Sequence, residues 1–418
     1  MTEMRTDHDA LGALEVPDDA LYGANAARAA VNFAVDGPTL GQCPAVVRAY
    51  LEVKLAAARA NVDAGALAPR DGDAIVAACR QLLDDLPEQA FPVPLVHGGG
   101  GTAANMNVNE VVASVANQRL GSVRGSDGSI DPHVHVNRSQ STNDTYPTVL
   151  RLVCIPEVEH LAGALEHLAG VYDIKAEEYD DGSQRLGRTC LRDALPVPIA
   201  ATHRSQAVAL RRVAGDLRTA GGDLHAVPLG ATAVGTGAGA PNGYAERVVA
   251  YLGEATGLAL RVSADPFDAL ASIDDLVAVA DVLERAVLVL DRYARDLRLL
   301  SSGPVGGIGE VELPAVQVGS SMMPGKANPV MPELVLQVGL QVRAACSVVR
   351  GAAALGELEL NVMEPVVIAE LPRALRRLAQ ATELFADRCV RGLVWNLDRV
   401  QAHLEGSLLA ATTVAGRR

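Results

Sequence analysis

The sequence predicts a mainly α-helical protein, and three observations carry that prediction. Hydrophobic residues make up 49 % of the 418 residues but aromatic residues only 3 %, so the core must be aliphatic. A core of Ala, Val and Leu suits long, closely packed helices. Apolar residues at helical spacing predict long helices over residues 156–179, 202–219, 272–300 and 333–354. The chain is also long enough for two or three domains.

The N-terminal third is expected to be less regular. Residues 1–45 are punctuated by Pro and Gly, and we expect them to be irregular. Apolar residues at helical spacing, beginning with Val47 and Tyr50, predict a helix from about residue 45 to about residue 67. A run of four glycines at 98–101 then leads into another predicted helix, and residues 121–137 are expected to form a loop.

The longest predicted helix indicates self-association. From Ile273 to Leu300 the chain has no proline or glycine and keeps helical spacing, so this helix should span roughly 40 Å. Residues 202–219 and 272–300 carry apolar side chains on more than one side of the helix. Such helices need partners all round, which predicts a bundle covered by neighbouring chains and therefore a homo-oligomer.

Composition excludes several classes of partner. A net charge of −14 argues against nucleic acid and against anionic membrane surfaces. No uncharged apolar run reaches membrane-spanning length, and the N-terminus has no apolar signal segment. The cysteines are scattered without metal-ligand spacing, so we expect reduced core thiols in a cytoplasmic protein. No metal site and no cofactor are expected.

The densest group of polar residues is a loop at residues 319–329. It has glycines at both ends, adjacent hydroxyls at Ser320 and Ser321, and then Lys326 and Asn328. A cation, an amide and free backbone N–H groups can hold an anion and place a hydroxyl beside it. These groups suit removal of a proton from the carbon next to a carboxylate, because the developing charge falls on the carboxylate oxygens. The alternative is a plain connection between two helices.

Three further segments place polar residues where a bundle would favour apolar ones. Residues 139–144, Ser-Gln-Ser-Thr-Asn-Asp, precede an apolar helix, and an ordinary N-cap is the alternative. Residues 187–193 combine a hydroxyl, a thiol and a charge pair that looks buried, or else form a helix-capping turn with a salt bridge. Thr102 follows the glycine run, where bare backbone could cradle a carboxylate. Together they favour binding of a small dicarboxylate.

These segments match a known family in order along the chain. Residues 319–328 resemble the signature loop GSSxMPxKxN of the fumarase/aspartase superfamily. The resemblance runs from about residue 15 to about residue 410 and includes five further blocks: Tyr22-Gly23 with Arg28, Gly101-Thr102 with 105–110, Ser139 to Asp144, Gly187-Arg188-Thr189 with Asp193, and Leu360-Asn361-Val362.

The resemblance implies an architecture of three mostly helical domains. These would be an N-terminal domain at 1–138, a central domain at 139–388 built as a five-helix bundle, and a C-terminal domain at 389–418. In the family, four subunits form a twenty-helix core, and each active site takes residues from three subunits. Because family sequences usually continue further, the third domain is expected to be shortened here.

The resemblance also implies a reaction: anti-elimination from a 2-substituted succinate to give fumarate through an aci-carboxylate. Ser320 would be the general base that takes the C3 proton, and loop N–H groups with Lys326 would stabilise its anion. Lys326 and Asn328 are similar to residues that hold one carboxylate. The residues that would grip the other carboxylate and the leaving group are Thr102, Ser141, Thr142, Asn143, Thr189 and Cys190.

Supporting positions are implied in the same way. Ser321 and Met323 belong to the signature loop, and Glu333 resembles an acid that orients a histidine in many relatives.

Departures from the family pattern bear on the leaving group. Cys190 stands where fumarases carry histidine and aspartases carry glutamine or histidine. Expulsion of hydroxide benefits from a general acid, whereas an ammonium group leaves as ammonia without one. A thiol is a weak hydrogen-bond donor, so loss of the histidine costs a fumarase more. Residues 323–333 and 358–365 also resemble aspartases, since fumarases usually carry Phe-Lys at Met363 and Glu364. Aspartate ammonia-lyase chemistry is therefore predicted.

Other readings remain open. Cys190, Ala103, the acidic Glu357 and Glu359, and a shortened third domain suit a specialised lyase for another 2-substituted succinate. A class II fumarase is the next alternative. A catalytically inactive member of the superfamily is the last, and the intact Ser320 and its loop argue against it.

Overall fold

The computed structural model describes residues 3–122 and 128–407, and it confirms a mainly α-helical fold. The chain forms two compact units, each made of three segments. The first unit comprises Met1–Pro156, Gly221–Ala278 and Ser347–Pro372, and the second comprises Glu157–Ala220, Val279–Cys346 and Arg373–Arg418. The domain boundaries expected after residues 138 and 388 stay a prediction.

The first unit opens with a β-hairpin and a short helix, so the prediction of an irregular segment over 1–45 is wrong. Strand β1 (Met4–Asp9) pairs antiparallel with β2 (Gly12–Pro17), and α1 spans Ala24–Asn32. The hairpin buries mainly Asp7 and Val16, so it shows no apolar alternation. Helix α1 is short and buries only alanines, which give a weak hydrophobic signal.

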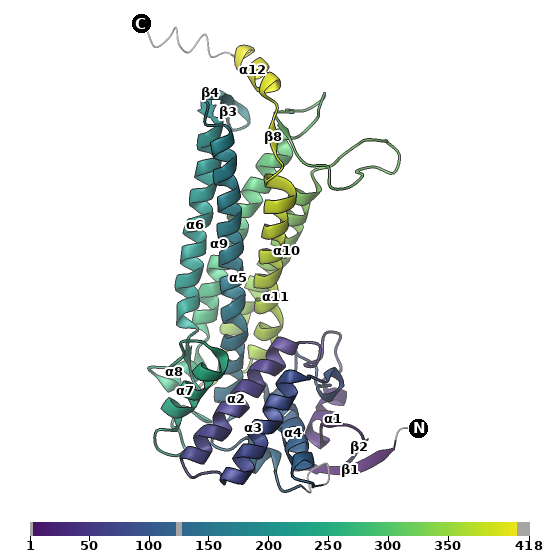
Figure 1. Cartoon of the computed structure of the whole chain (residues 1–418), viewed down its shortest axis with the longest axis vertical. Coiled ribbons are helices and arrows are strands. Elements are labelled where there is room, and N and C mark those ends of the chain that lie inside the picture. Colours follow the sequence, from purple (N-terminus) through teal and green to yellow (C-terminus); the bar gives the residue numbers. More distant parts are fainter. Residues whose placement is uncertain (1–2, 123–127, 408–418) are drawn as a thin grey trace. The chain divides into compact units, whose positions relative to one another are not determined.

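Helices α2, α3 and α4 form the body of the first unit. They span Pro44–Asp63, Pro69–Asp84 and Thr102–Arg119, and they pack in that order, with α7 (Tyr244–Thr256) against α2 (Figure 1). The predicted helix at 45–67 is confirmed and ends at Asp63. Proline at the start of α2 and α3 suits the first helical position, because the missing N–H has no helical partner there.

Several short elements complete the first unit. A π-helical turn at Pro132–Val136 is capped by Asp131, whose carboxylate accepts the N–H groups of His133 and Val134. The expected loop over 121–137 therefore contains one ordered turn, while residues 123–127 lie outside the described residues. The remaining elements are Glu88–Ala90 (η1), Ala226–Val227 (β5), Arg261–Val262 (β6) and Pro266–Ala271 (α8).

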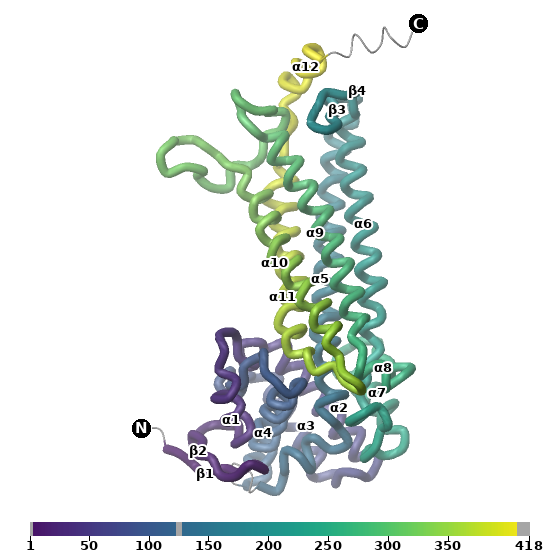
Figure 2. Tube along the Cα trace, turned by 180° about the vertical axis from the view of Figure 1, so that it is seen from behind, coloured from purple at the N-terminus to yellow at the C-terminus, as the bar shows by residue number. Residues whose placement is uncertain are grey.

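Long helices, each with its greater part in the second unit and one end in the first, run alongside one another in both views (Figures 1 and 2). They are α5 (Thr142–Glu178), α6 (Ile199–Asp223), α9 (Asp274–Leu300), α10 (Val330–Ala353) and α11 (Glu364–Phe385). The four predicted long helices are all present. Their core is aliphatic, with Leu, Val and Ala at most buried positions, as the composition predicts.

Two of these helices contain internal prolines and were not predicted over their full length. Helix α5 begins at Thr142 and passes through Pro147 and Pro156, although its regular part was expected from residue 156. Helix α11 was not predicted and contains Pro372. An internal proline costs a helix about 3 kcal/mol. Burial of apolar side chains such as Leu371 and Leu375 of α11 outweighs that cost.

The end of the second unit carries small β elements. Strands β3 (Gln184–Thr189) and β4 (Arg192–Pro198) form a hairpin, and β7 (Val311–Glu312) pairs with β8 (Val394–Trp395). A π-helical turn spans Ala386–Val390 (η3), and α12 spans Leu397–Glu405. Residues 187–193 thus form a hairpin rather than a helix-capping turn.

The cysteines follow the expectation. Cys79, Cys154, Cys346 and Cys389 are buried, Cys43 is half-buried, and Cys190 is exposed, and none of them forms a disulfide within the described residues. Across the described residues, no helix is both long and apolar enough to cross a membrane. The cytoplasmic location stays a prediction.

Candidate active site

The signature loop folds around the hydroxyl of Ser320. Its Oγ accepts two backbone hydrogen bonds, from the N–H of Met322 at 3.1 Å and from the N–H of Met323 at 2.9 Å. The loop is closed by the Gly319 N–H, which donates to the Lys326 carbonyl at 2.8 Å. Ser320 is half-buried, whereas Ser321 and Met323 are exposed. Two N–H dipoles converging on one oxygen favour a negative charge on that oxygen.

Glycine is required at the start of this loop. A Cβ on Gly319 would lie only 2.8 Å from both the Asn328 nitrogen and the Lys326 carbonyl oxygen. Asn328 also links the two ends of the loop, because its side-chain amide donates a hydrogen bond to the Gly319 carbonyl at 2.9 Å. The amide of Asn328 therefore holds the loop closed through one N–H. The close approach of the two loop ends creates the turn that aims both N–H groups at Ser320.

Lys326 of the signature loop is exposed. Within the described residues, its ammonium group forms no ion pair and no hydrogen bond. It is one of only three lysines in a chain of net charge −14. A lysine without a protein counter-ion is available to an anionic ligand.

Glu333 lies in the first turn of α10, four positions beyond the loop. Its Oε1 is 3.7 Å from Nη2 of Arg298 on α9. In the part of the chain that the structure describes, no histidine contacts Glu333, so its partner here is an arginine.

Thr189 and Cys190 lie at the tip of the β3–β4 hairpin, and both are exposed. Cys190 and Leu191 are the turn residues, with φ of 52° and 59°. Such left-handed backbone is typical of two-residue hairpin turns. Arg192 and Asp193 are exposed, so the charge pair that looked buried in the sequence is not buried. Figures 1 and 2 both show the signature loop projecting away from this hairpin.

The base of the hairpin is fixed by a buried carboxylate. Arg188 donates two hydrogen bonds to Glu310, at 2.9 and 2.6 Å, and Nδ1 of His403 lies 2.6 Å from the same carboxylate. Burial alone would raise the pKa of Glu310, but the bonds with Arg188 and His403 outweigh burial and hold that pKa below its usual value. Arg188 therefore anchors the hairpin that presents Thr189 and Cys190.

Thr102 lies in the first unit, at the first position of α4. It is exposed, and its Oγ1 donates to the Gly99 carbonyl at 2.9 Å. Gly101 has φ of 93°, and a Cβ there would overlap the ring of Tyr146 on α5. Glycine thus lets the start of α4 lie directly against α5.

Ser141, Thr142 and Asn143 begin α5 in the same unit and are half-buried. The Ser141 hydroxyl accepts the N–H of Asn143 at 3.2 Å, so this residue does serve as a cap. The amide of Asn143 donates to the Ala233 carbonyl at 2.7 Å, and Thr142 Oγ1 accepts from Asn105 of α4 at 3.1 Å. The cluster is therefore held by contacts to α4 and to the 230–233 segment.

A buried lysine organises this part of the site, and the sequence reading missed it. Nζ of Lys54 donates to the amide oxygens of Asn105 at 2.7 Å, Gln140 at 2.9 Å and Asn137 at 3.1 Å. Lys54 is fully buried, which lowers its pKa to about 7, although nearby Asp144 opposes the shift. A lysine within the apolar stretch 51–58 was the available signal.

Asp144 ties the start of α5 to a neighbouring loop. Its carboxylate accepts the N–H groups of Ser141 at 3.0 Å, Thr232 at 2.8 Å and Gly230 at 3.1 Å. Burial raises the pKa of Asp144 to about 6, and these N–H donors limit the rise. Asp144 therefore fixes the start of α5, which carries Thr142 and Asn143, to the 230–232 segment.

Glu364, at the start of α11, is also buried. Burial raises its pKa to about 8, although Arg151 favours the charged form. Arg151 is already engaged, because its Nε lies 2.8 Å from Asp275. Glu364 is therefore mostly protonated at neutral pH.

Replacing Glu364 is expected to change how stability depends on pH. The folded protein keeps the Glu364 proton up to about pH 8, whereas an unfolded glutamate loses it near pH 4, so stability falls as pH rises between those values. Glu364→Gln cannot ionise and should be more stable than the parent at pH 8.5 by about 2–4 kcal/mol. Unfolding midpoints at pH 5 and 8.5 measure this. Exposed Glu357→Gln is the control, and a Glu364→Gln slope equal to the parental slope would contradict the expectation.

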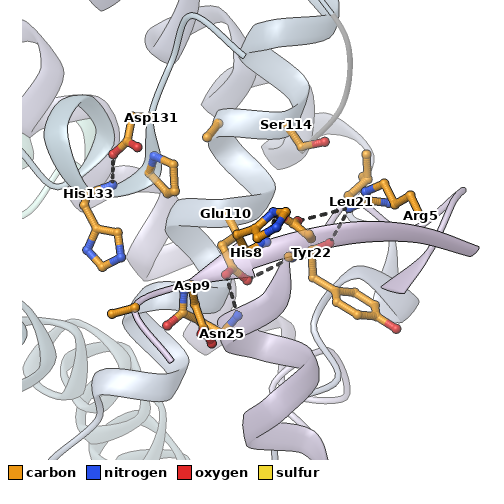
Figure 3. A pocket seen from close by; sticks show the side chains of 15 residues that line it. Arg5, His8, Asp9, Leu21, Tyr22, Asn25, Glu110, Ser114, Asp131 and His133 are labelled. Atoms are coloured by element: carbon orange, nitrogen blue, oxygen red, sulfur yellow. Dashed lines mark hydrogen bonds and ion pairs between the residues drawn. The ribbon is translucent and has the colours of Figure 1, made fainter. Parts of the chain in front are cut away.

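A separate cavity of about 260 Å³ lies in the first unit between the β1–β2 hairpin, α1, α4 and the π-helical turn (Figure 3). Glu110 reaches its wall and accepts the N–H groups of Gly23 and Asn25, at 2.9 Å each, at the start of α1. Its carboxylate therefore caps a helix. His133 lines the cavity, and none of the residues predicted to bind substrate does.

Comparison with known proteins settles the family. A family model described as "Lyase" matches residues 12–344. The chain belongs to the fumarase/aspartase superfamily of lyases.

Its relatives have two activities. An aspartate ammonia-lyase from Corynebacterium glutamicum is 40 % identical over 407 residues, covering 97 % of this chain and 77 % of that protein. A class II fumarate hydratase from Thermosynechococcus vestitus is 38 % identical over 414 residues, covering 99 % and 88 %. The crystal structure of a fumarate lyase:delta crystallin from Brucella melitensis matches with a TM-score of 0.95 and 39 % identity, covering 99 % and 90 %.

These relatives establish a lyase and its fold. The ammonia-lyase and the hydratase match almost equally well, so overall similarity does not choose the leaving group. That choice rests on individual residues of the site.

Proposed function

We propose that this lyase eliminates ammonia from L-aspartate to give fumarate. The observation that carries the proposal is the pair of backbone N–H groups, from Met322 and Met323, that converge on Ser320 Oγ. A serine hydroxyl is a useful base only if its anion is stabilised, and two N–H donors about 3 Å away supply that stabilisation.

The first step of the proposed reaction is proton removal. Ser320 Oγ, as the alkoxide, takes the proton from C3 of the substrate. The electron pair of the C3–H bond moves toward the carboxylate attached to C3, which becomes an aci-carboxylate. Lys326, exposed and without a protein counter-ion in the described residues, supplies the positive charge for that carboxylate.

The second step releases the nitrogen. The electron pair returns to form the C2=C3 double bond while the C2–N bond breaks, and its pair leaves with ammonia. An ammonium substituent needs no proton from the enzyme, so Cys190 at the hairpin tip suffices. Within one described chain Glu333 pairs with Arg298, and Cys190 stands where fumarases carry the histidine that would protonate a leaving hydroxide.

We further propose that each site is assembled from several copies in a homotetramer. Thr102 and the 141–143 cluster belong to the first compact unit, whereas the signature loop and the hairpin tip belong to the second. Within the second unit the loop projects away from the hairpin. Neighbouring subunits would bring these groups together around one dicarboxylate, as the family resemblance implies.

Turnover with two substrates tests the leaving group. Purified protein is given L-aspartate or L-malate, and fumarate is followed by its ultraviolet absorbance, then in reverse with and without ammonia. The proposal expects rapid fumarate formation from aspartate and a reverse reaction that requires ammonia. Fumarate from malate, with no response to ammonia, would identify a fumarase instead.

Restoring a histidine at the hairpin tip is expected to raise malate dehydration. Cys190 is exposed and not needed for packing, so Cys190→His should fold normally. Its imidazole can protonate a leaving hydroxide, and we expect activity on malate to rise about tenfold or more. Cys190→Ser, which keeps the size but adds no acid, is the matched control. An equal rise in both variants would contradict the role given to position 190.

A specialised lyase for a larger amine is the second candidate. Within one chain, the side chains of Thr189 and Cys190 at the hairpin tip are exposed and smaller than the histidine of fumarases at position 190, which leaves more room for the leaving group. A lack of turnover with aspartate and malate, combined with addition of a larger amine to fumarate, would favour this candidate.

A further inference from the structure

The second unit contains a cavity that none of the proposed catalytic residues lines. Its volume is about 240 Å³, and three arginines reach its wall: Arg185 and Arg188 of β3 and Arg292 of α9. Trp395 closes another side. We call it the arginine cavity.

The three guanidinium groups differ in their ion pairs with carboxylates of the protein. Arg188 is satisfied by the buried carboxylate of Glu310. Arg292 has Asp296 one helical turn away, with Nε 3.8 Å from the carboxylate oxygen. Arg185 has no ion pair with any described residue. Its Nε donates to Thr202 and its Nη1 to the Leu186 carbonyl, each at 3.3 Å.

Arg185 is therefore a partly desolvated charge that forms no ion pair with any described residue. Burial lowers its pKa, and the charges of Glu310 and of Asp296, which also lines the cavity, offset that only in part. Removing a cation from water without a partner is unfavourable, and a bound anion would relieve the cost.

Trp395 and His203, which also line the cavity, carry no charge at neutral pH. The indole N–H of Trp395 donates to Nε2 of His203 at 3.0 Å, so the His203 proton is on Nδ1, which donates to Gln206 at 3.0 Å. Burial lowers the pKa of His203 to about 4. His203 thus adds no charge at neutral pH and holds Trp395 in place.

We propose that the arginine cavity binds a small anion through carboxylate or phosphate oxygens, with Arg185 as the principal ligand and Arg292 at the mouth. The planar guanidinium fork suits both kinds of anion. The cavity is smaller than pockets for drug-sized ligands, so it suits a ligand with one or two acid groups. Three arginines around one cavity are notable in a chain of net charge −14.

The position of the cavity connects it to the candidate active site. Arg185 and Arg188 lie on β3, which ends at Thr189, and Leu191 of the turn also reaches the cavity. An anion held between β3 and α9 would restrain the hairpin that presents Cys190. The proposed site is nevertheless separate from Ser320 and Lys326, and it does not depend on the leaving group.

Tryptophan fluorescence tests the proposal directly. Trp395 is the only tryptophan of the chain and lines the cavity, so its emission reports on the site. The full-length protein is titrated with succinate and, separately, with inorganic phosphate, at constant ionic strength set by chloride. We expect a saturable change with at least one anion. A response to succinate alone identifies a carboxylate ligand, and a response to phosphate alone identifies a phosphate ligand.

Variants assign the signal to the cavity. Arg185→Gln and Arg292→Gln should each raise the apparent Kd for the anion by about tenfold or more, which is the effect of losing one charged hydrogen bond. The Arg292 side chain is 67 % exposed, so its replacement does not threaten folding. Arg204→Gln is the matched control, because Arg204 lies on α6 outside the cavity and pairs with Asp180. Its Kd should be unchanged.

The remaining outcomes overturn the proposal. It would be contradicted if neither anion caused a saturable fluorescence change in folded protein. It would also be contradicted if the apparent Kd for the anion rose equally in Arg185→Gln, Arg292→Gln and Arg204→Gln. Lys326→Met removes the cation of the signature loop, and the fluorescence response should survive this change. Loss of the response in Lys326→Met would show that the signal came from the catalytic site.

Discussion

Ser320→Ala is expected to lower kcat for fumarate formation by about 10²–10⁴-fold, the range for loss of a general base. The substitution removes the only side-chain oxygen on which the N–H groups of Met322 and Met323 converge. The loop should survive, because its closing bond runs from the Gly319 N–H to the Lys326 carbonyl. Steady-state fumarate absorbance measures the loss, and circular dichroism and molecular mass verify the folded assembly.

Ser321→Ala provides the matched comparison. Ser321 is the adjacent hydroxyl, but it is exposed, and the two N–H groups point at its neighbour. Its loss of activity should be at least about tenfold smaller than that of Ser320→Ala. If both variants lose activity equally, the base assignment is wrong and the loop acts only as a polar surface.

Lys54→Met is expected to damage both stability and activity. The change leaves the amide oxygens of Asn105 and Gln140 without a donor, whereas Asn137 still accepts from Asn105 and Asn109. Each unsatisfied group costs about 1–3 kcal/mol, so we expect a loss of about 2 kcal/mol or more in the free energy of unfolding. Activity should fall as well, because Asn105 also donates to Thr142 of the substrate-binding cluster.

The pH dependence distinguishes Lys54 from an ordinary packing residue. Its pKa is about 7 in the folded protein and about 10.4 in an unfolded chain. Between those values the unfolded chain binds the extra proton, so this residue makes stability rise with pH from about 7 to 10. Asp144 and Cys79 are the titratable groups that act on Lys54 electrostatically.

Unfolding of the parent and Lys54→Met across pH 6–10 measures this contribution. The variant should lack the rise. Lys175→Met, which removes a lysine paired with Glu178 on α5, should keep it. A rise that persists in Lys54→Met would show that another group titrates.

The helical fold was largely predictable because long aliphatic helices give a periodic signal that dominates their local sequence. The misses share a cause. The β1–β2 hairpin buries Asp7 rather than an apolar face, and α11 contains Pro372, so local rules argued against elements that tertiary packing stabilises. The turn at Cys190 and Leu191 lacks the Asn or Gly that usually marks a hairpin.

The candidate site was predictable in composition but not in geometry. The residues of the signature loop were named from their chemistry, yet the two N–H groups on Ser320 Oγ depend on backbone angles that composition does not specify. Lys54 was missed because its three amide partners lie 51 to 86 positions further along the chain. The partner of Arg188, Glu310, is 122 positions away and carries no local signal.

Ser320 is proposed to act in a site completed by another subunit, and mixing two inactive variants tests this most directly. Ser320→Ala lacks the base, and Asn143→Ala lacks a group of the first compact unit. The two are co-expressed with different affinity tags, and only tetramers carrying both tags are assayed for fumarate release. If different copies supply the two residues, random assembly leaves about a quarter of the sites with both intact, and activity should return to about that fraction of the parent. Activity no higher than that of either variant alone would mean that one chain supplies both residues, and would contradict the account.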